Sequence, residues 1–132
     1  ERLSRPVLMW SDEWVGLPYA ELARGPKAYD CLGLFLALHR VRFGRDLPDP
    51  ELSIRDAVRQ GAVDTYRPRY ERVSIAQEGD ALLFRMAGRP LHLGYALDNT
   101  DMLHIDAVAD SRVECWRRAS WLGKLEGIYR IA

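Results

Sequence analysis

The sequence predicts an α+β fold in which N-terminal helices pack on one five-stranded antiparallel sheet. Apolar residues follow helical spacing in the first part of the chain, and a period of two begins at Asp80. Short turns such as Gly88-Arg89-Pro90 separate the later apolar runs, which favours an antiparallel meander with the helices on one face. The chain has 132 residues, of which 48% are hydrophobic, so we expect a single domain over 1–132.

The first helices are expected on either side of a loop. Residues 5–15 carry apolar side chains at helical spacing and predict a short helix, which a Gly- and Pro-rich loop follows. Asp30 is a favoured N-cap, and residues 31–43 are apolar on nearly every side. Gly44 stands at the expected helix end. The segment 31–43 is therefore the predicted buried central helix.

The rest of the chain is expected to supply one more helix and then the sheet. Ser53 caps a short amphipathic helix that runs to Gln60 and ends at Gly61. The segment 62–78 is polar and irregular. Five short apolar runs then predict five strands, at 81–86, 91–97, 102–107, 112–116 and 126–131.

The composition argues against several classes of partner. A formal net charge of zero, from 19 Lys+Arg and 19 Asp+Glu, leaves no long-range positive field to attract nucleic acid. The apolar runs fall far short of the ~20 residues of a membrane-spanning helix, and we expect no signal sequence. Two cysteines are too few for a disulfide framework. Nucleic acid and membrane are therefore not expected partners.

Cys31 is the first candidate for chemistry. It opens the predicted central helix, where unpaired backbone N–H groups and the helix dipole lower the pKa of a thiol. The carboxylate of Asp30 acts in the opposite direction unless capping engages it, and the sequence leaves that balance open. A small buried hydrophobe is the structural alternative for Cys31. Cys115, on a predicted strand, is expected to be a core residue or an inert surface thiol.

His92 and His104 lie on neighbouring predicted strands, where each alternates with large apolar residues. Gly94 shares the face of His92, which leaves room for a helix end that carries a nucleophile. A histidine satisfied between helix and sheet is the alternative. An odd loop of three residues centred near Asp98 or Asn99 would bring the two imidazoles together, whereas a two-residue Asn99-Thr100 turn would put them on opposite faces. If His92 and His104 act together in one site, the loop between their strands is therefore expected to be odd.

Together, Cys31, His92 and His104 supply a nucleophile, a general base and a residue that orients the base, which is the logic of papain-like peptidases. The second imidazole would fix the tautomer of His92 through its remote nitrogen. The same three residues could also form a zinc site, but no closely spaced ligand pair supports it, so we expect no metal and no cofactor. His39, next to Arg40, is expected at the surface.

Several motifs of the chain resemble those of the NlpC/p60 cell-wall peptidases. The resemblance runs from about residue 10 to the end and is carried by Gly16-Leu17-Pro18-Tyr19, Arg24-Gly25-Pro26, Tyr29-Asp30-Cys31-Leu32-Gly33-Leu34, Glu78-Gly79-Asp80-Ala81-Leu82-Leu83-Phe84 and His92-Leu93-Gly94. Asp-Cys-x-Gly-Leu, Gly-Asp-x-x-x-Phe and His-x-Gly in this order are fairly specific. The stretch Arg42-Phe43-Gly44-Arg45-Asp46-Leu47-Pro48-Asp49 resembles the phage and prophage tail-assembly branch.

The resemblance implies a papain-like core with Cys31 as nucleophile, His92 as base and His104 as the third polar member. It also implies that Tyr19 holds its hydroxyl near the site, to bind substrate or the developing oxyanion together with the backbone N–H of Cys31. Family members typically cleave the γ-D-glutamyl–diaminopimelate bond, or related bonds, in peptidoglycan stem peptides without a metal. Phage relatives further imply other tail proteins as partners, and the virion or the bacterial cytoplasm as location, with action at the cell wall.

The chain also departs from many relatives. Ala20-Glu21-Leu22-Ala23 replaces a Gly-rich stretch, and Leu32 follows Cys31 in place of Ser or Trp, so the shape of the substrate groove stays open. Glu21 and Arg24 either rim the cleft or belong to a solvated loop. Packing is the expected role of three aromatic residues, with sugar stacking as the alternative: Trp116, Trp121 and Tyr129.

The sequence thus predicts a cysteine peptidase that hydrolyses peptidoglycan stem peptides through a thioester acyl-enzyme. One alternative is an amidase or acyltransferase of the same fold, because bond choice depends on groove shape. The other is a non-catalytic structural protein of a phage tail tip. Intact candidates at Cys31, His92 and His104 favour the enzyme.

Overall fold

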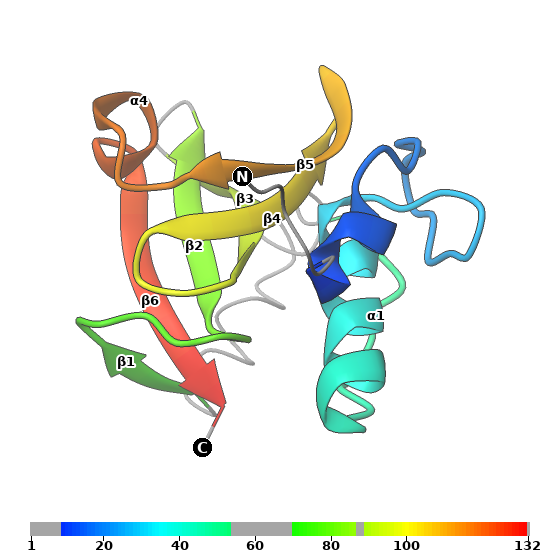
Figure 1. Ribbon diagram of the computed structural model, residues 1–132, viewed down its shortest axis with the longest axis horizontal. Coiled ribbons are helices and arrows are strands. Elements are labelled where there is room, and N and C mark those ends of the chain that lie inside the picture. The colour runs from blue at the N-terminus through cyan, green and yellow to red at the C-terminus, as the bar shows by residue number, and fades with distance from the viewer. Residues whose placement is uncertain (1–8, 54–69, 87–88, 132) are drawn as a thin grey trace, which may run out of the picture.

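A computed structural model describes residues 9–53, 70–86 and 89–131, which form an α+β fold around one antiparallel sheet (Figure 1). The sheet has six strands in the order β1-β6-β2-β3-β4-β5. Their bounds are β1 Tyr70–Val73, β2 Ala81–Met86, β3 Arg89–Ala96, β4 Asp101–Asp106, β5 Ala109–Cys115 and β6 Leu125–Ile131. Strands β2 to β5 form the predicted meander, and β6 returns to pair with β2.

The predicted count of five strands was wrong. The additional strand, β1, lies within the segment 62–78 that was expected to be irregular. Its residues show no apolar alternation, and among the described strands its one neighbour is the distant strand β6, where Tyr70 pairs with Ile131. The five predicted strands are all present, with small shifts at their ends.

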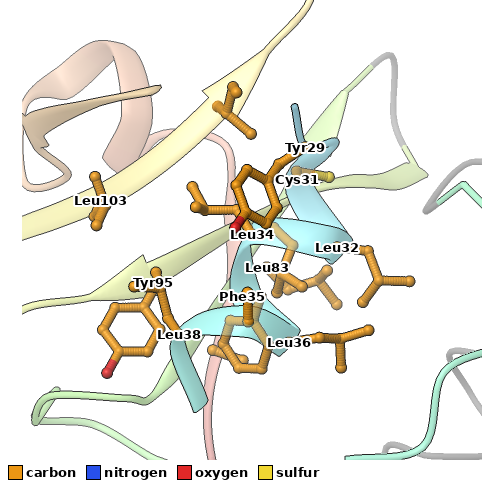
Figure 2. Packing of buried hydrophobic residues seen from close by; sticks show 14 of the residues in the cluster. Tyr29, Cys31, Leu32, Leu34, Phe35, Leu36, Leu38, Leu83, Tyr95 and Leu103 are labelled. Atoms are coloured by element: carbon orange, nitrogen blue, oxygen red, sulfur yellow. The ribbon is translucent and has the colours of Figure 1, made fainter. Parts of the chain in front are cut away.

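Helix α1 (Cys31–Phe43) is the predicted central helix, and it begins and ends where expected. The side chain of Asp30 accepts a hydrogen bond from the backbone N–H of Gly33 at 2.7 Å, which caps the first turn. Gly44 ends the helix with a φ of 65°, a left-handed conformation that glycine adopts without steric cost. Figure 2 shows how the apolar side chains of α1 pack together with side chains of the sheet, Leu83, Tyr95 and Leu103 among them.

The other predicted helices are only partly described. The helix expected at 5–15 appears as a 3-10 helix, η1 (Trp10–Trp14), and its first residues lie outside the described part of the chain. The helix expected from Ser53 to Gln60 lies outside the described residues except for its cap. A further short helix, α4 (Ala119–Leu122), was not predicted. Among the described residues, no helix is long and apolar enough to cross a membrane.

Both faces of the sheet are buried. One face carries large apolar side chains at odd-numbered positions and packs against α1 (Figure 1): Leu83, Leu93, Tyr95, Leu103 and Ile105. The opposite face buries even-numbered side chains beneath the segment that follows β5: Leu82, Phe84, Ala96, Met102 and Ile128, together with Trp116. Strands β2, β3, β4 and β6 therefore supply alternate residues to two separate cores.

Candidate active site

Two histidines and a carboxylate form a hydrogen-bonded chain across β3, β4 and β5. Nε2 of His92 lies 2.9 Å from Nδ1 of His104, and Nε2 of His104 lies 2.7 Å from Oε2 of Glu114. Both imidazoles are buried, with exposed fractions of 5% for His92 and 1% for His104. We call these three residues the histidine relay.

The loop between β3 and β4 brings the two imidazoles together. Because Tyr95 pairs with Leu103, the connection is symmetrical about an odd loop of three residues, 98–100, as the sequence predicted. His92 and His104 consequently project from the same face of the sheet. The paired part of β3 and β4 ends before these residues, so the bond between the imidazoles joins the two strands where their backbones are no longer paired. We call this unpaired stretch of β3 and β4 the opening.

The space beside His92 on this face is filled by another strand. A Cβ atom at Gly94 would lie 2.8 Å from Sδ of Met102 and 3.5 Å from Cε2 of Phe84. Side chains of β4 and β2 therefore occupy the room that the sequence had suggested for a helix end. The start of α1 instead approaches β3 beside the opening.

Cys31 reaches the edge of β3 from the start of α1. Its thiol forms a hydrogen bond with the backbone of Leu93, the residue that follows His92. Figure 2 shows Cys31 in the first turn of the helix, close to Tyr29. Burial raises the pKa of the thiol to about 12, although hydrogen bonds from the backbone at Leu93 and Leu32 lower it. Burial therefore outweighs the effect expected from the helix start.

The imidazoles of the relay are neutral at physiological pH. Burial lowers the pKa of His92 to about 3, and the neighbouring imidazole of His104 lowers it as well. Burial also lowers the pKa of His104, although the hydrogen bond to Glu114 raises it. The resting site thus favours a neutral thiol beside neutral imidazoles.

Charged groups at the start of α1 act on the pKa of the thiol in opposite directions. Nη1 of Arg24 lies 2.8 Å from Oδ1 of Asp30, and Nε of Arg24 lies 2.9 Å from Oδ2 of Asp49. The charge of Asp30 raises the pKa of Cys31, and that of Arg24 lowers it. Arg24 is therefore part of an ion-pair network at the helix start, whereas Glu21 is exposed.

Tyr19 is half-buried close to this helix start. Burial raises its pKa, and the negative charge of Asp30, with that of Cys31 when its thiol is ionised, would raise it further. Tyr19 forms a parallel bridge with Tyr29, two residues before Cys31. The backbone therefore brings Tyr19 close to the start of α1.

Trp121, which the sequence had assigned to packing, covers the relay. Its ring stacks on His92 with centroids 5.4 Å apart and an interplanar angle of 27°. It meets His104 edge to face at 5.0 Å, and its Nε1 donates to Oε1 of Glu114 at 3.4 Å. One half-buried indole thus contacts all three members of the relay.

Sequence reasoning missed Glu114 and the ion pairs around it. Nε of Arg112 lies 2.8 Å from Oε2 of Glu114, and Nη2 of Arg112 lies 3.1 Å from Oδ2 of Asp106. A signal was present, because Arg112 and Glu114 are alternate polar residues on the strand after His104. The register makes Arg112 the direct partner of His104 and places Glu114 diagonally from it.

The remaining candidates lie away from the relay. The prediction for His39 was wrong, because its side chain is fully buried and its Nε2 lies 2.7 Å from the carbonyl oxygen of Gly79. Cys115 is a half-buried free thiol. Trp116 and Tyr129 are buried in the two cores, as expected for packing residues.

One group of side chains has metal-ligand geometry in the part of the chain that the structure describes. Ligand atoms of His92, His104 and Asp106 lie within 4.8 Å of one another. The two imidazoles bond to each other, and the carboxylate of Asp106 is held by Arg112, so an ion would have to replace these bonds. We assign no metal to the group, and the expectation of a metal-free site stays a prediction.

Comparison with known proteins identifies the fold. The chain matches, with a TM-score of 0.69 and 19% identity over 92% of its length, an NlpC/p60 family protein from Bacillus cereus. It has the NlpC/p60 fold. The NlpC/p60 domain of the peptidoglycan hydrolase SagA matches with a TM-score of 0.62 and 19% identity over 90% of the chain. A lipoprotein-like NLP/p60 protein from Staphylococcus aureus matches with a TM-score of 0.64 and 22% identity, also over 90%.

The matched structures differ in length. The chain spans 91% of the SagA domain but 38% of the S. aureus protein and 37% of the B. cereus protein. No protein-family model matches the sequence, and no curated protein matches it either. The likeness to NlpC/p60 structures is therefore one of fold, and the tail-assembly branch stays a prediction.

Proposed function

We propose that this chain is a cysteine peptidase domain that hydrolyses peptidoglycan stem peptides at a γ-D-glutamyl–diaminopimelate-type bond. One observation carries the proposal: a thiol at a helix start contacts the backbone beside His92, whose imidazole belongs to a buried hydrogen-bonded relay. The NlpC/p60 fold supports the substrate class, since one matched structure is the domain of a peptidoglycan hydrolase.

In the proposed reaction, Cys31 attacks the carbonyl carbon of the scissile amide. His92 accepts the thiol proton at Nδ1, because its Nε2 is engaged with His104. The tetrahedral intermediate collapses to a thioester, and the proton passes from His92 to the leaving amine. Water then attacks the thioester, gives a proton to His92, and releases the acid while the thiol is restored.

Tyr19 and the backbone N–H of Cys31 are the proposed donors to the developing oxyanion. The position of Cys31 at the first turn of α1 supports this role, because the N–H groups of that turn have no partner within the helix. The position of half-buried Tyr19, bridged to Tyr29 beside the helix start, supports the second donor.

The test is the release of soluble muropeptides from purified peptidoglycan, with mass spectrometry of the new ends. We expect Cys31→Ala and His92→Ala to lose release by at least ~100-fold, and His104→Ala to lose less, since it orients the base. Cys115→Ser, which changes the other free thiol, is the matched control and should release as much as the wild type.

The products also distinguish the alternatives. New ends at another amide would indicate an amidase, and transfer to an added amine would indicate an acyltransferase. Release by Cys31→Ala at the wild-type level would overturn the proposal. A wild type that releases nothing and whose Cys31 resists alkylation would favour a structural protein of a phage tail tip.

A further inference from the structure

Glu114 is the one charged end of the histidine relay. Its Oε2 lies 2.7 Å from Nε2 of His104 and 2.8 Å from Nε of Arg112. Partial burial raises the pKa of Glu114, but hydrogen bonds from His104 and Trp121 and the positive charge of Arg112 lower it, with a net decrease. Glu114 is therefore ionised at neutral pH, and an ionised carboxylate can only accept hydrogen bonds.

This restriction fixes the proton of His104. Since Glu114 can only accept, the hydrogen bond requires the proton of His104 to be on Nε2. A neutral imidazole carries one proton, so Nδ1 of His104 has a lone pair. The contact with His92 therefore requires Nε2 of His92 to be the donor.

The same reasoning continues to His92. With its one proton on Nε2, a neutral His92 has its lone pair on Nδ1, the nitrogen that is not engaged with His104. If the relay carried its protons in the opposite sense, Nδ1 of His92 would bear a proton and could not accept another. The direction of both hydrogen bonds thus decides whether His92 is a base toward the thiol.

We propose that Glu114 is a positioning residue that sets the tautomers of His104 and His92, and so makes Nδ1 of His92 the proton acceptor. The inference rests on the proposed function, because it assigns the base of that reaction. It extends the assigned triad by a fourth residue on β5, which touches neither the thiol nor, in the proposed reaction, the substrate.

The groups around the relay act on a protonated His92 in both directions. Glu114 and Asp106 favour the imidazolium of His92 electrostatically, whereas His104 and Arg112 disfavour it. Arg112 bonds to both carboxylates and so restrains them beside the relay. Trp121 covers both rings and shields the hydrogen bonds from water.

The first test reads the tautomers directly, by imidazole nitrogen chemical shifts in NMR spectra of the free protein. The chain has only three histidines, and His39, bonded to Gly79, is an internal reference. We expect protons on Nε2 of both His92 and His104 in the wild type. Glu114→Leu should give a mixture of tautomers at both residues, and Glu114→Gln, whose amide oxygen can still accept, should restore the wild-type pattern.

The second test measures alkylation of Cys31 by iodoacetamide between pH 6 and 9, with Cys115 replaced by Ser. The rate at neutral pH should fall ~10-fold in Glu114→Leu and stay within about threefold of wild type in Glu114→Gln. Glu71→Leu, an exposed substitution on β1, is the matched control and should leave both measurements unchanged.

A wild-type proton on Nδ1 of His92, or an unchanged tautomer pattern in Glu114→Leu, would overturn the inference. Both tests are independent of substrate, so they separate its failure from that of the proposed function. If the tautomers are as expected and peptidoglycan is not cleaved, the function is wrong and the positioning role stands.

Discussion

The carboxylate of Asp30, next to the candidate nucleophile, is itself restrained. The carboxylate of Asp30 accepts hydrogen bonds from the backbone of Gly33 and Leu22 and from Arg24. These bonds direct its negative charge into the loop and the helix start, where the helix dipole favours it. A carboxylate next to a nucleophilic thiol is therefore compatible with thiolate formation during a reaction.

Trp121 provides a prediction at the level of one residue. Because burial is the main cause of the low pKa of His92, Trp121→Ala should raise that pKa toward the ordinary value of a histidine. Muropeptide release should fall ~10-fold as the imidazole loses the ring that holds it. Proton NMR titration of the His92 ring measures the pKa, and Trp121→Phe, which keeps an aromatic ring, should shift it less. An unchanged pKa in Trp121→Ala would contradict the role of the indole.

At the scale of single residues, the sequence predicted the positions that follow from the alternation of side chains along a strand. His92 and His104 share a face because both alternate with large apolar residues and the loop between them is odd. Glu114 was not foreseen, because it pairs directly with Met102 and approaches His104 only diagonally. His39 is buried because the loop at Gly79 passes over it. The local sequence around His39 holds no information about the path of that loop.

Among the elements, those defined by local signals were predicted best. Helix α1 has its cap at Asp30 and its end at Gly44, both readable within one turn. Strand β1 has no apolar alternation and forms through its pairing with β6. In sequence order, β1 is the first strand of the sheet and β6 is the last. Non-local pairing of this kind has no signature within the strand itself.

Gly33 provides a prediction for the start of α1. A Cβ atom there would collide with the carbonyl oxygen of Ala23, in the loop that also carries Arg24. Although alanine favours helices, Gly33→Ala should lower the free energy of unfolding by about 1–3 kcal/mol. It should also slow alkylation of Cys31, because the loop that orients Asp30 must shift.

Gly44→Ala is the matched control at the other end of α1. No atom lies within 4 Å of a Cβ there, but the φ of +65° is unfavourable for alanine, so a loss of about 1–2 kcal/mol is expected. Urea denaturation measures both losses. Equal rates of Cys31 alkylation in the two variants would show that the contact between residue 33 and Ala23 does not affect the reactivity of the thiol.

For the whole molecule, the two halves of the sequence meet at the opening between β3 and β4. The helical half supplies Cys31 at a helix start, and the sheet supplies the relay on three consecutive strands. The relay lies on the sheet face opposite the core of α1, and the end of the β3–β4 pairing lets the helix start approach His92. The site therefore depends on the sheet as much as on the helix.

The stability of the whole molecule should depend on pH through its histidines. All three have a pKa lowered by burial, so the folded state disfavours their charged forms. Their contribution is fully present above the pKa of an unfolded histidine, ~6.5, and is lost as the pH falls below it. Carboxylates with lowered pKa, such as Glu78 and Asp106, act in the same direction only below pH ~4.5.

Between pH 6 and 5 the free energy of unfolding should therefore fall by up to about 4 kcal/mol per pH unit, since each histidine contributes about 1.4 kcal/mol. Urea denaturation at a series of pH values measures this slope. His39→Phe removes one of the three groups and should reduce the slope, whatever its effect on stability at neutral pH. A slope unchanged by His39→Phe would mean that this histidine stays as easily protonated in the folded protein as in the unfolded chain.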